Sequence, residues 1–112
     1  MSSITTHVLD TAQGRPAVGI PVSLHVQVGD AWKQVGRGIT NRDGRIAELI
    51  PAGELRSGRY RLTFDTSAYL TRSASPAFFP EIFIVFEIHD AAQHYHVPLL
   101  LSPYGYSTYR GS

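Results

Sequence analysis

HYHVPLLLSPYGYSTYRGS, from His94 to Ser112, is the most informative segment of this chain about its fold. Its side chains alternate in character as far as Leu101, as expected where successive residues of a β-strand point to opposite faces. One face is apolar or aromatic throughout and should lie in a core: Tyr95, Val97, Leu99 and Leu101. The other face carries His94 and His96 and should line something polar. Pro98 lacks a backbone N–H, which predicts either a strand position that faces away from a neighbouring strand or an irregularity in this strand.

The rest of the chain repeats this alternation in short segments separated by glycine and proline, a pattern typical of antiparallel strands. The segments expected to be strands are 4–10, 22–28, 32–40, 45–46, 58–65 and 81–89. Asp43-Gly44 predicts a tight turn that leads Arg45 into its short strand, and Thr66–Arg72 predicts one short helix. Seven or eight short strands with one helix indicate an all-β, two-sheet β-sandwich that occupies residues 1–112 as a single domain.

The segment Glu81–His89 is apolar on both faces, so it must be covered on both sides. One side belongs to the core of the sandwich. We expect the second covering to come from another subunit, through strand pairing across a two-fold axis that would also protect the short terminal strand.

Composition excludes several classes of protein. At 112 residues, 43% hydrophobic and 17% charged, the chain has the size and character of one globular domain. The absence of cysteine excludes disulfides and thiolate chemistry. A formal charge of +1 with scattered arginines argues against a nucleic-acid partner. The first residues do not resemble a signal peptide and no apolar run nears the ~20 residues that span a bilayer, so we expect a cytoplasmic protein without a membrane partner.

The five histidines differ in their surroundings. His25 lies on the polar face of a regular strand and is expected to be solvated, and His89 ends its strand and is expected to be structural. His7 and His96 each interrupt an otherwise non-titrating strand face near a chain end, and His94 could support His96. The His94-x-His96 pair allows a zinc site only if His7 supplies a third ligand. The rival use of these imidazoles is general acid–base catalysis without a metal.

Two further features have a plain and a functional interpretation. Arg45 is either a solvated turn cation or a planar donor fork for the carbonyl oxygens of a flat polar substrate. The terminal Gly111-Ser112 is either a frayed tail or part of a site. The residues alone leave both alternatives open.

A resemblance to a known family, carried by four motifs, decides between these interpretations of Arg45 and of the C-terminal tail. TTHVLDT at 5–11, NRDGR at 41–45, FFPEI at 78–82 and the stretch from 94 to 112 resemble the 5-hydroxyisourate hydrolases, the transthyretin-related proteins of purine breakdown. The similarity spans essentially the whole chain. Transthyretins are similar across LLSPYxYST but lack the two histidines and the terminal RGS, so the closing YRGS places the resemblance on the hydrolase side.

The resemblance implies a transthyretin-like (prealbumin-like) sandwich of about eight strands, and a homotetramer built as a dimer of dimers. It implies hydrolysis of the small molecule 5-hydroxyisourate to 2-oxo-4-hydroxy-4-carboxy-5-ureidoimidazoline, without a cofactor or metal. The alternative is a transthyretin-like carrier that binds a small aromatic ligand without turnover. The implied site residues are His7, Arg45, His96 and Ser112 as catalytic groups, with His7, Arg45, Tyr109, Arg110 and Ser112 in contact with substrate.

In the mechanism that the resemblance implies, His96, oriented by Ser112, has the larger part in activating water. His7 shares or completes the proton relay, and Arg45 clamps the substrate and stabilises developing negative charge. Which histidine is base and which is acid stays open. Tyr109 and Arg110 either hold the tail in place or contact the substrate.

Overall fold

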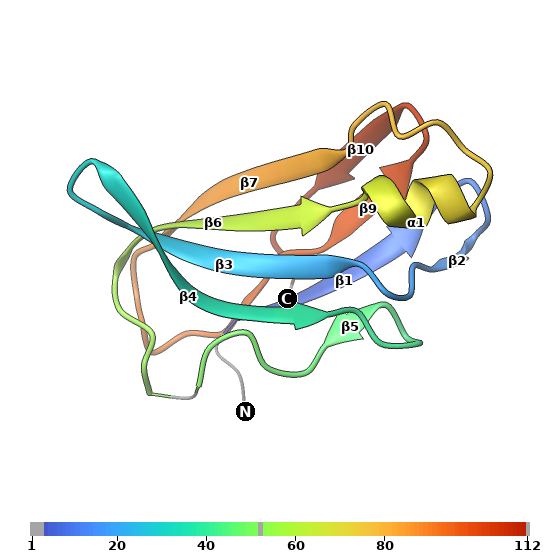
Figure 1. Ribbon diagram of the computed structural model, residues 1–112. Coiled ribbons are helices and arrows are strands. Elements are labelled where there is room, and N and C mark those ends of the chain that lie inside the picture. Colours follow the sequence, from blue (N-terminus) through green and yellow to red (C-terminus); the bar gives the residue numbers. More distant parts are fainter. Residues whose placement is uncertain (1–3, 52, 112) are drawn as a thin grey trace.

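Two β-sheets pack face to face with one short helix at one end of the sandwich (Figure 1). This computed structural model describes residues 4–51 and 53–111. The predicted all-β, two-sheet sandwich with one short helix is confirmed.

The first sheet is antiparallel and has the strand order β4-β3-β6-β7. Its strands are β3 (Pro21–Val28), β4 (Ala31–Ile39), β6 (Gly58–Asp65) and β7 (Glu81–Ile88). Each lies within one residue of a predicted segment, because period-2 alternation is a strong signal where one face is buried. The buried face is continuous across the strands, since Leu24 on β3 is opposite Leu62 on β6.

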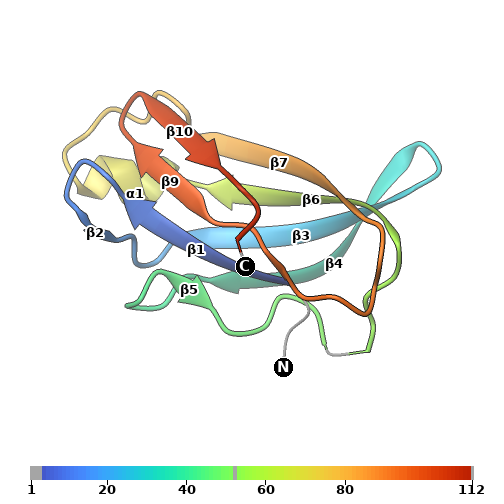
Figure 2. The same ribbon diagram turned by 180° about the vertical axis from the view of Figure 1, so that it is seen from behind.

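The second sheet is arranged around β1 (Ile4–Asp10), which is seen most directly in Figure 2. On one side β1 pairs in antiparallel fashion with β2 (Arg15–Pro16) and β5 (Arg45–Ile46). On the other side it pairs in parallel with β8 (Tyr95–His96) and β9 (Leu99–Ser102). The last strand, β10 (Gly105–Thr108), pairs with β9 and ends the sheet.

The described residues form ten strand segments, more than the seven or eight predicted, because short ladders split the chain further. The predicted strand from His94 to Leu101 divides into β8 and β9 around Val97 and Pro98. Pro98 has no N–H to give to a ladder, so the predicted irregularity is confirmed at this position.

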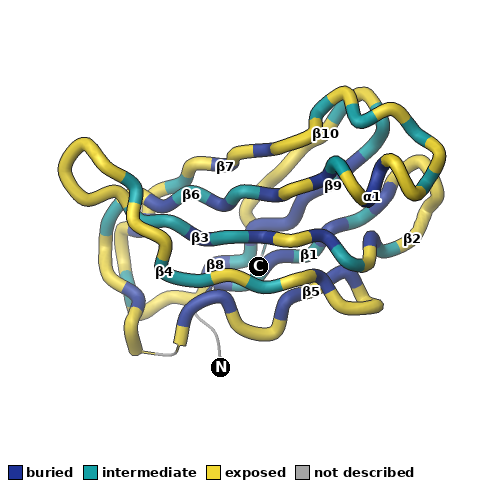
Figure 3. The backbone as a smooth tube through the Cα atoms, in the orientation of Figure 1, coloured by how far each residue is buried: buried dark blue, intermediate teal, exposed yellow. Residues whose placement is uncertain are grey.

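Burial follows the predicted alternation. Ile4, Thr6 and Val8 of β1 are buried, whereas Thr5 and His7 between them are only half-buried. Figure 3 shows buried and more exposed residues alternating along the strands in this way. The apolar face predicted near the C-terminus is buried as well: Tyr95, Val97, Leu99 and Leu101. The inner face of β1 therefore belongs to the core, and its outer face is left free for polar side chains.

Two residues of β3 depart from expectation. The alternation of segment 22–28 predicts that Val28 points inward with Val22 and Leu24. It is instead 59% exposed, because the β3–β4 hairpin projects beyond the end of the sandwich (Figure 1). His25 was predicted to be solvated but is half-buried, and its Nδ1 has no hydrogen-bond partner among the described residues. Burial, followed by the nearby Arg61 guanidinium, lowers the pKa of His25.

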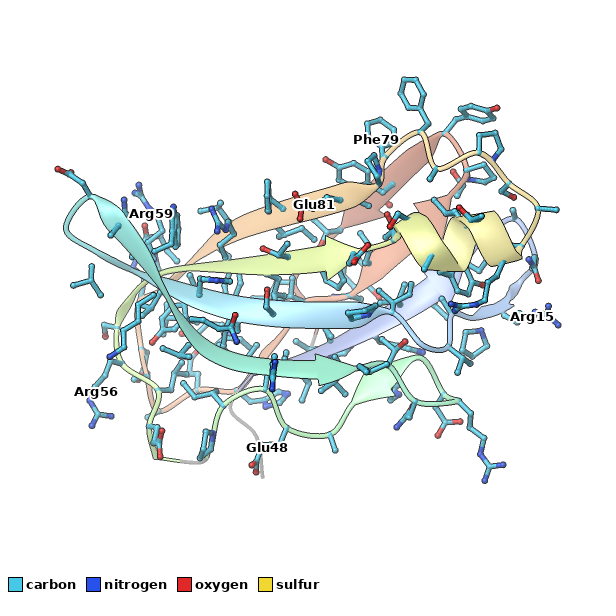
Figure 4. The ribbon with its side chains drawn as sticks, in the orientation of Figure 1. Arg15, Glu48, Arg56, Arg59, Phe79 and Glu81 are labelled. Carbon is cyan, nitrogen blue, oxygen red and sulfur yellow. The ribbon has the colours of Figure 1, made fainter. Side chains whose placement is uncertain are left out.

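Charged and apolar groups on the surface are distributed as the sequence suggested. Figure 4 shows Arg15 and Arg56 at different ends of the molecule, pointing away from the sandwich. On β7, Phe83 and Val85 point outward and are 50% and 53% exposed. The strand carries apolar side chains on both faces, as predicted, and those on its outer face are exposed in this chain.

The helix α1 (Ser67–Arg72) is fastened to β1 by one buried hydrogen bond. The Tyr69 hydroxyl donates to Oδ2 of Asp10 at 2.6 Å, and Oδ1 of the same carboxylate accepts from the Gln13 N–H at 3.0 Å. Burial, together with the Asp10 carboxylate, raises the pKa of Tyr69 to about 12. At six residues α1 is too short to cross a bilayer, and no helix among the described residues is long and apolar enough to do so.

Replacing Tyr69 by phenylalanine should destabilise the fold. The substitution keeps the ring but removes one hydrogen-bond donor from the Asp10 carboxylate. Asp10 is only 5% exposed, so water cannot readily replace this donor. We expect the free energy of unfolding to fall by about 1–3 kcal/mol in chemical denaturation. Tyr104→Phe is the matched control, because Tyr104 is 66% exposed and should tolerate the loss of its hydroxyl. An unchanged unfolding midpoint for Tyr69→Phe would show that the bond contributes nothing.

Candidate active site

Strand pairing brings four side chains from three parts of the sequence onto the outer face of the β1 sheet. Thr5 and His7 lie two residues apart on β1 and therefore share a face. His96 on β8 is the register partner of Thr5, and Arg45 on β5 is the register partner of His7. Because directly paired residues project to the same side of a sheet, these four side chains form one polar cluster.

The turn before β5 fixes the position of Arg45. Oδ1 of Asn41 accepts hydrogen bonds from the N–H groups of Asp43 at 2.9 Å and Arg45 at 3.1 Å. Gly44 has φ +75°, and a Cβ there would lie 2.5 Å from the Val8 carbonyl oxygen. The Val8 N–H donates to the Gly44 carbonyl at 2.8 Å, so the turn lies directly against β1. Only glycine combines this backbone conformation with so close an approach.

The C-terminal tail crosses the His96 ring. The Gly111 N–H donates to the His96 carbonyl at 2.8 Å, forming an isolated bridge between the two residues. A Cβ on Gly111 would lie 2.6 Å from Cδ2 of His96, so the tail passes the ring at a distance that only glycine allows. On the other side of the ring, Nδ1 lies 2.8 Å from Oγ1 of Thr5.

Both clustered imidazoles are biased toward the neutral form. Burial and then the Arg45 guanidinium lower the pKa of His7. A backbone hydrogen bond at Asp43 and the charge of Asp43 act in the opposite direction. Burial, then Arg45, His7 and His94, lower the pKa of His96, opposed by a backbone hydrogen bond at Thr5. Nε2 of His7 is buried and has no hydrogen-bond partner among the described residues. At neutral pH the cluster thus presents two unprotonated bases beside one permanent cation.

A shallow surface pocket opens at this cluster. Its lining comes from four segments of the chain: Thr5, Thr6, Asn41, Arg45, Ile46, Ala47, His94 and His96. Among the described residues, the lining holds donors, neutral acceptors and a guanidinium but no side-chain carboxylate. Such a lining suits a small ligand rich in carbonyl oxygens.

The structure places His7, Arg45 and His96, three of the predicted catalytic residues, on one sheet face, and Arg45 and His96 line the pocket. Ser112, predicted to be catalytic, lies outside the described residues, although its neighbour Gly111 is bonded to His96. The catalytic roles predicted for these residues (His7, Arg45, His96 and Ser112) stay predictions.

Tyr109 and Arg110 lie elsewhere within the subunit. Both line a second, more apolar pocket beside β7. The Arg110 guanidinium stacks over the Tyr95 ring at 4.5 Å, and its Nη2 donates to Oε1 of Gln93 at 2.9 Å. These contacts anchor the tail, and the predicted contact of Tyr109 and Arg110 with substrate stays a prediction.

The zinc alternative required His7 to join His94 and His96 as a third ligand. Across residues 4–51 and 53–111, no group of three or more histidine, cysteine or acidic side chains is placed to hold a metal ion. Instead, His94 and His96 both lie within hydrogen-bond distance of the Thr5 hydroxyl, at 3.1 and 2.8 Å.

Two residues of the site were not predicted from the sequence. Thr5 was assigned only to the first strand, although alternation already placed it on the same face as His7. Asn41 was included in a turn, and an asparagine two residues before Asp43-Gly44 is a recognised signal for a side chain that caps the turn backbone.

Comparison with known proteins agrees with this geometry. A model of the HIUase/Transthyretin family matches residues 4–111. The 5-hydroxyisourate hydrolase 2 of Rhizobium meliloti is 50% identical, with 97% of this chain and 95% of that protein covered. The structure of Klebsiella pneumoniae 5-hydroxyisourate hydrolase superposes with a TM-score of 0.83 at 41% identity, covering 97% of this chain and 98% of that one.

The fold is shared more widely than the hydrolases. The crystal structure of sea bream transthyretin in complex with thyroxine has a TM-score of 0.91 at 33% identity, covering 97% of this chain and 94% of that one. The predicted transthyretin-like sandwich is confirmed by this similarity. A full-length match to the family model, close relatives and the same fold lead to one conclusion: the chain belongs to the HIUase/Transthyretin family.

Proposed function

We propose that this chain is an enzyme that hydrolyses 5-hydroxyisourate to 2-oxo-4-hydroxy-4-carboxy-5-ureidoimidazoline, a step of urate breakdown. The observation that carries the proposal is the convergence of His7, His96 and Arg45 on one sheet face through the pairing of β1 with β5 and β8. The curated relatives named 5-hydroxyisourate hydrolase support it, since they are about as long as this chain and 46–50% identical to it.

Hydrolysis of a cyclic amide requires a base, a positive charge and a proton source at the site. A base must take a proton from water as its oxygen attacks the carbonyl carbon, and a cation must stabilise the negative charge that develops on the carbonyl oxygen. The C–N bond then breaks and the departing nitrogen takes up a proton. We assign water activation to His96, the proton relay to His7, and charge stabilisation and substrate orientation to Arg45.

Arg45 is also suited to this substrate before reaction. Its planar guanidinium offers paired N–H donors, and 5-hydroxyisourate is rich in carbonyl oxygens that can accept from them. Because burial and Arg45 lower the pKa values of both histidines, and outweigh the opposing effect of Asp43 on His7, the base form of each ring is available at neutral pH.

We further propose a homotetramer, a dimer of dimers, whose assembly completes the site. The edge strands β7 and β10 run along the same side of the sandwich (Figures 1 and 2) and expose apolar side chains. Phe83, Val85 and Tyr106 are 50%, 53% and 44% exposed, more than a stable monomer needs to leave uncovered. The site lies on an open sheet face, so a facing subunit would convert its shallow pocket into a cleft.

A transthyretin-like carrier is the competing function, and the likeness to sea bream transthyretin is its support. A carrier would bind a small aromatic ligand and leave it chemically unchanged. It has no use for two neutral imidazoles beside a guanidinium, which is why we favour the hydrolase.

The direct test is to generate 5-hydroxyisourate with urate oxidase and follow its ultraviolet decay. The wild-type protein should accelerate decay over the spontaneous rate. His7→Ala and His96→Ala should each lower turnover by ~10²–10⁴-fold, because each removes a proton-transfer group. His25→Ala, on the outer face of the opposite sheet, is the matched control and should keep wild-type turnover. A wild-type protein that binds the compound without hastening its decay would favour the carrier.

The pH dependence tests the electrostatic role of Arg45. The acid limb of kcat/KM should lie below pH 6.5, the ordinary imidazole value, because burial and Arg45 lower the pKa values of His7 and His96. Arg45→Gln removes a nearby positive charge, so the imidazolium forms more readily and the limb should move to higher pH.

The controls separate charge from shape. Arg45→Lys keeps the charge and should keep the limb in place while raising KM, because lysine lacks the planar fork. Arg42→Gln, in the same turn, should change neither quantity. A limb that stays in place or moves down in Arg45→Gln contradicts the assignment.

Shortening the tail tests the role of the C-terminus. Removing Arg110–Ser112 deletes the Gly111 bridge to His96 and the Arg110 stacking on Tyr95. We expect turnover to fall by roughly 10-fold or more, equivalent to losing one positioned hydrogen bond in the transition state. Removing Ser112 alone isolates the proposed contribution of that residue. Sedimentation should show an unchanged assembly, and full activity in the longer deletion would refute a catalytic tail.

A further inference from the structure

We propose that Thr5 is a positioning residue that sets the tautomer of His96. Its hydroxyl donates to Nε2 of His94 and accepts from Nδ1–H of His96, so that Nε2 of His96 carries a free lone pair and acts as the base. The catalytic consequence rests on the proposed hydrolase function.

The geometry places one hydroxyl between two rings. Oγ1 of Thr5 lies 2.8 Å from Nδ1 of His96 and 3.1 Å from Nε2 of His94, both within hydrogen-bond distance. A threonine hydroxyl has one proton, so it can donate to only one of the two rings and must accept from the other. The choice decides which nitrogen of His96 is protonated, because a neutral imidazole carries a single N–H.

The Thr5 backbone favours one of these arrangements. It acts to raise the pKa of His96, against the larger effects of burial and nearby positive charge that lower this pKa. A backbone group with that effect is a carbonyl, which only accepts. The Thr5 carbonyl faces this strand, since it also accepts from the Val97 N–H at 2.9 Å. The ring nitrogen on the Thr5 side is Nδ1, so Nδ1 carries the proton and the hydroxyl is free to donate to His94.

The position of Thr5 in the fold makes this arrangement rigid. Thr5 lies inside β1, which has paired strands on both sides, and its β-branched side chain has restricted χ1 freedom. His96 is held from the opposite side by the Gly111 N–H at 2.8 Å on its carbonyl. When Nε2 takes a proton from water, Nδ1–H keeps its bond to Thr5, so no group has to reorient during the transfer.

The test removes the hydroxyl while keeping the shape. Thr5→Val should lower kcat by about 10–100-fold with little change in KM, as when an orienting partner of a reactive histidine is lost. Thr5→Ser restores a hydroxyl and should recover most of the rate. Thr11→Val is the matched control, because Thr11 loses a comparable side-chain hydrogen bond, 3.1 Å to the Leu101 carbonyl, away from the cluster.

Nitrogen NMR of histidine-labelled protein reads the tautomer directly and does not depend on turnover. The His96 signals are assigned by their loss in His96→Ala. We expect Nδ1–H and unprotonated Nε2 in wild type, and a mixture of tautomers in Thr5→Val. Protonated Nε2 in wild type, or unchanged kcat in Thr5→Val, would overturn the inference. A wild type with the expected tautomer but no hydrolase activity would instead refute the proposed function and leave the positioning role intact.

Discussion

The register of β1 is the constraint on which the rest of this structure depends. One seven-residue strand pairs with β8 and β9 on one side and with β5 and β2 on the other. It thereby places His96 opposite Thr5 and Arg45 opposite His7. A register slip of one residue would turn the side chains of Thr5 and His7 into the core. It would also bring the inner face of β1, which includes Ile4, to the surface. The free energy of burying the core therefore also holds the polar cluster in place.

Two glycines allow the backbone to approach this strand closely enough. Gly44 brings the β5 turn against Val8, and Gly111 brings the tail against the His96 ring. At either position a Cβ would lie within 2.6 Å of a neighbouring atom, so the turn or the tail would have to move. As a result, the backbone of the β5 turn and that of the C-terminal tail bound the site on two sides, and the side chains of the cluster lie between them.

Among the described residues that line the pocket at the cluster, the charged side chain is that of Arg45, and no side-chain carboxylate is present. In many hydrolases an acidic group orients the histidine and stabilises its charged form. Here the Thr5 hydroxyl lies 2.8 Å from Nδ1 of His96, while burial and Arg45 lower the pKa values of both rings, against the opposing charge of Asp43 at His7. Such an arrangement keeps the bases unprotonated at neutral pH, at the cost of leaving Nε2 of His7 buried without a partner among the described residues.

Residue patterns were sufficient to predict the sandwich, the strand positions and the identity of the main polar groups. Alternation assigned the buried face of β1 and the apolar face from Tyr95 to Leu101, because burial of one face imposes a period of two on any strand. The Asp-Gly turn placed Arg45 at the start of a short strand, and the motifs around His7, His96 and the tail indicated the family.

Only the tertiary structure decided which of these groups meet and what orients them. The bonds from Thr5 to His94 and His96 join residues 89 and 91 positions apart, and no local pattern encodes which strand lies beside which. The orientation of Arg110 toward Tyr95 and Gln93 depended in the same way on the path of the tail. The physical reason is that periodicity reports the face on which a side chain lies, whereas the neighbour across the ladder is set by pairing between distant strands.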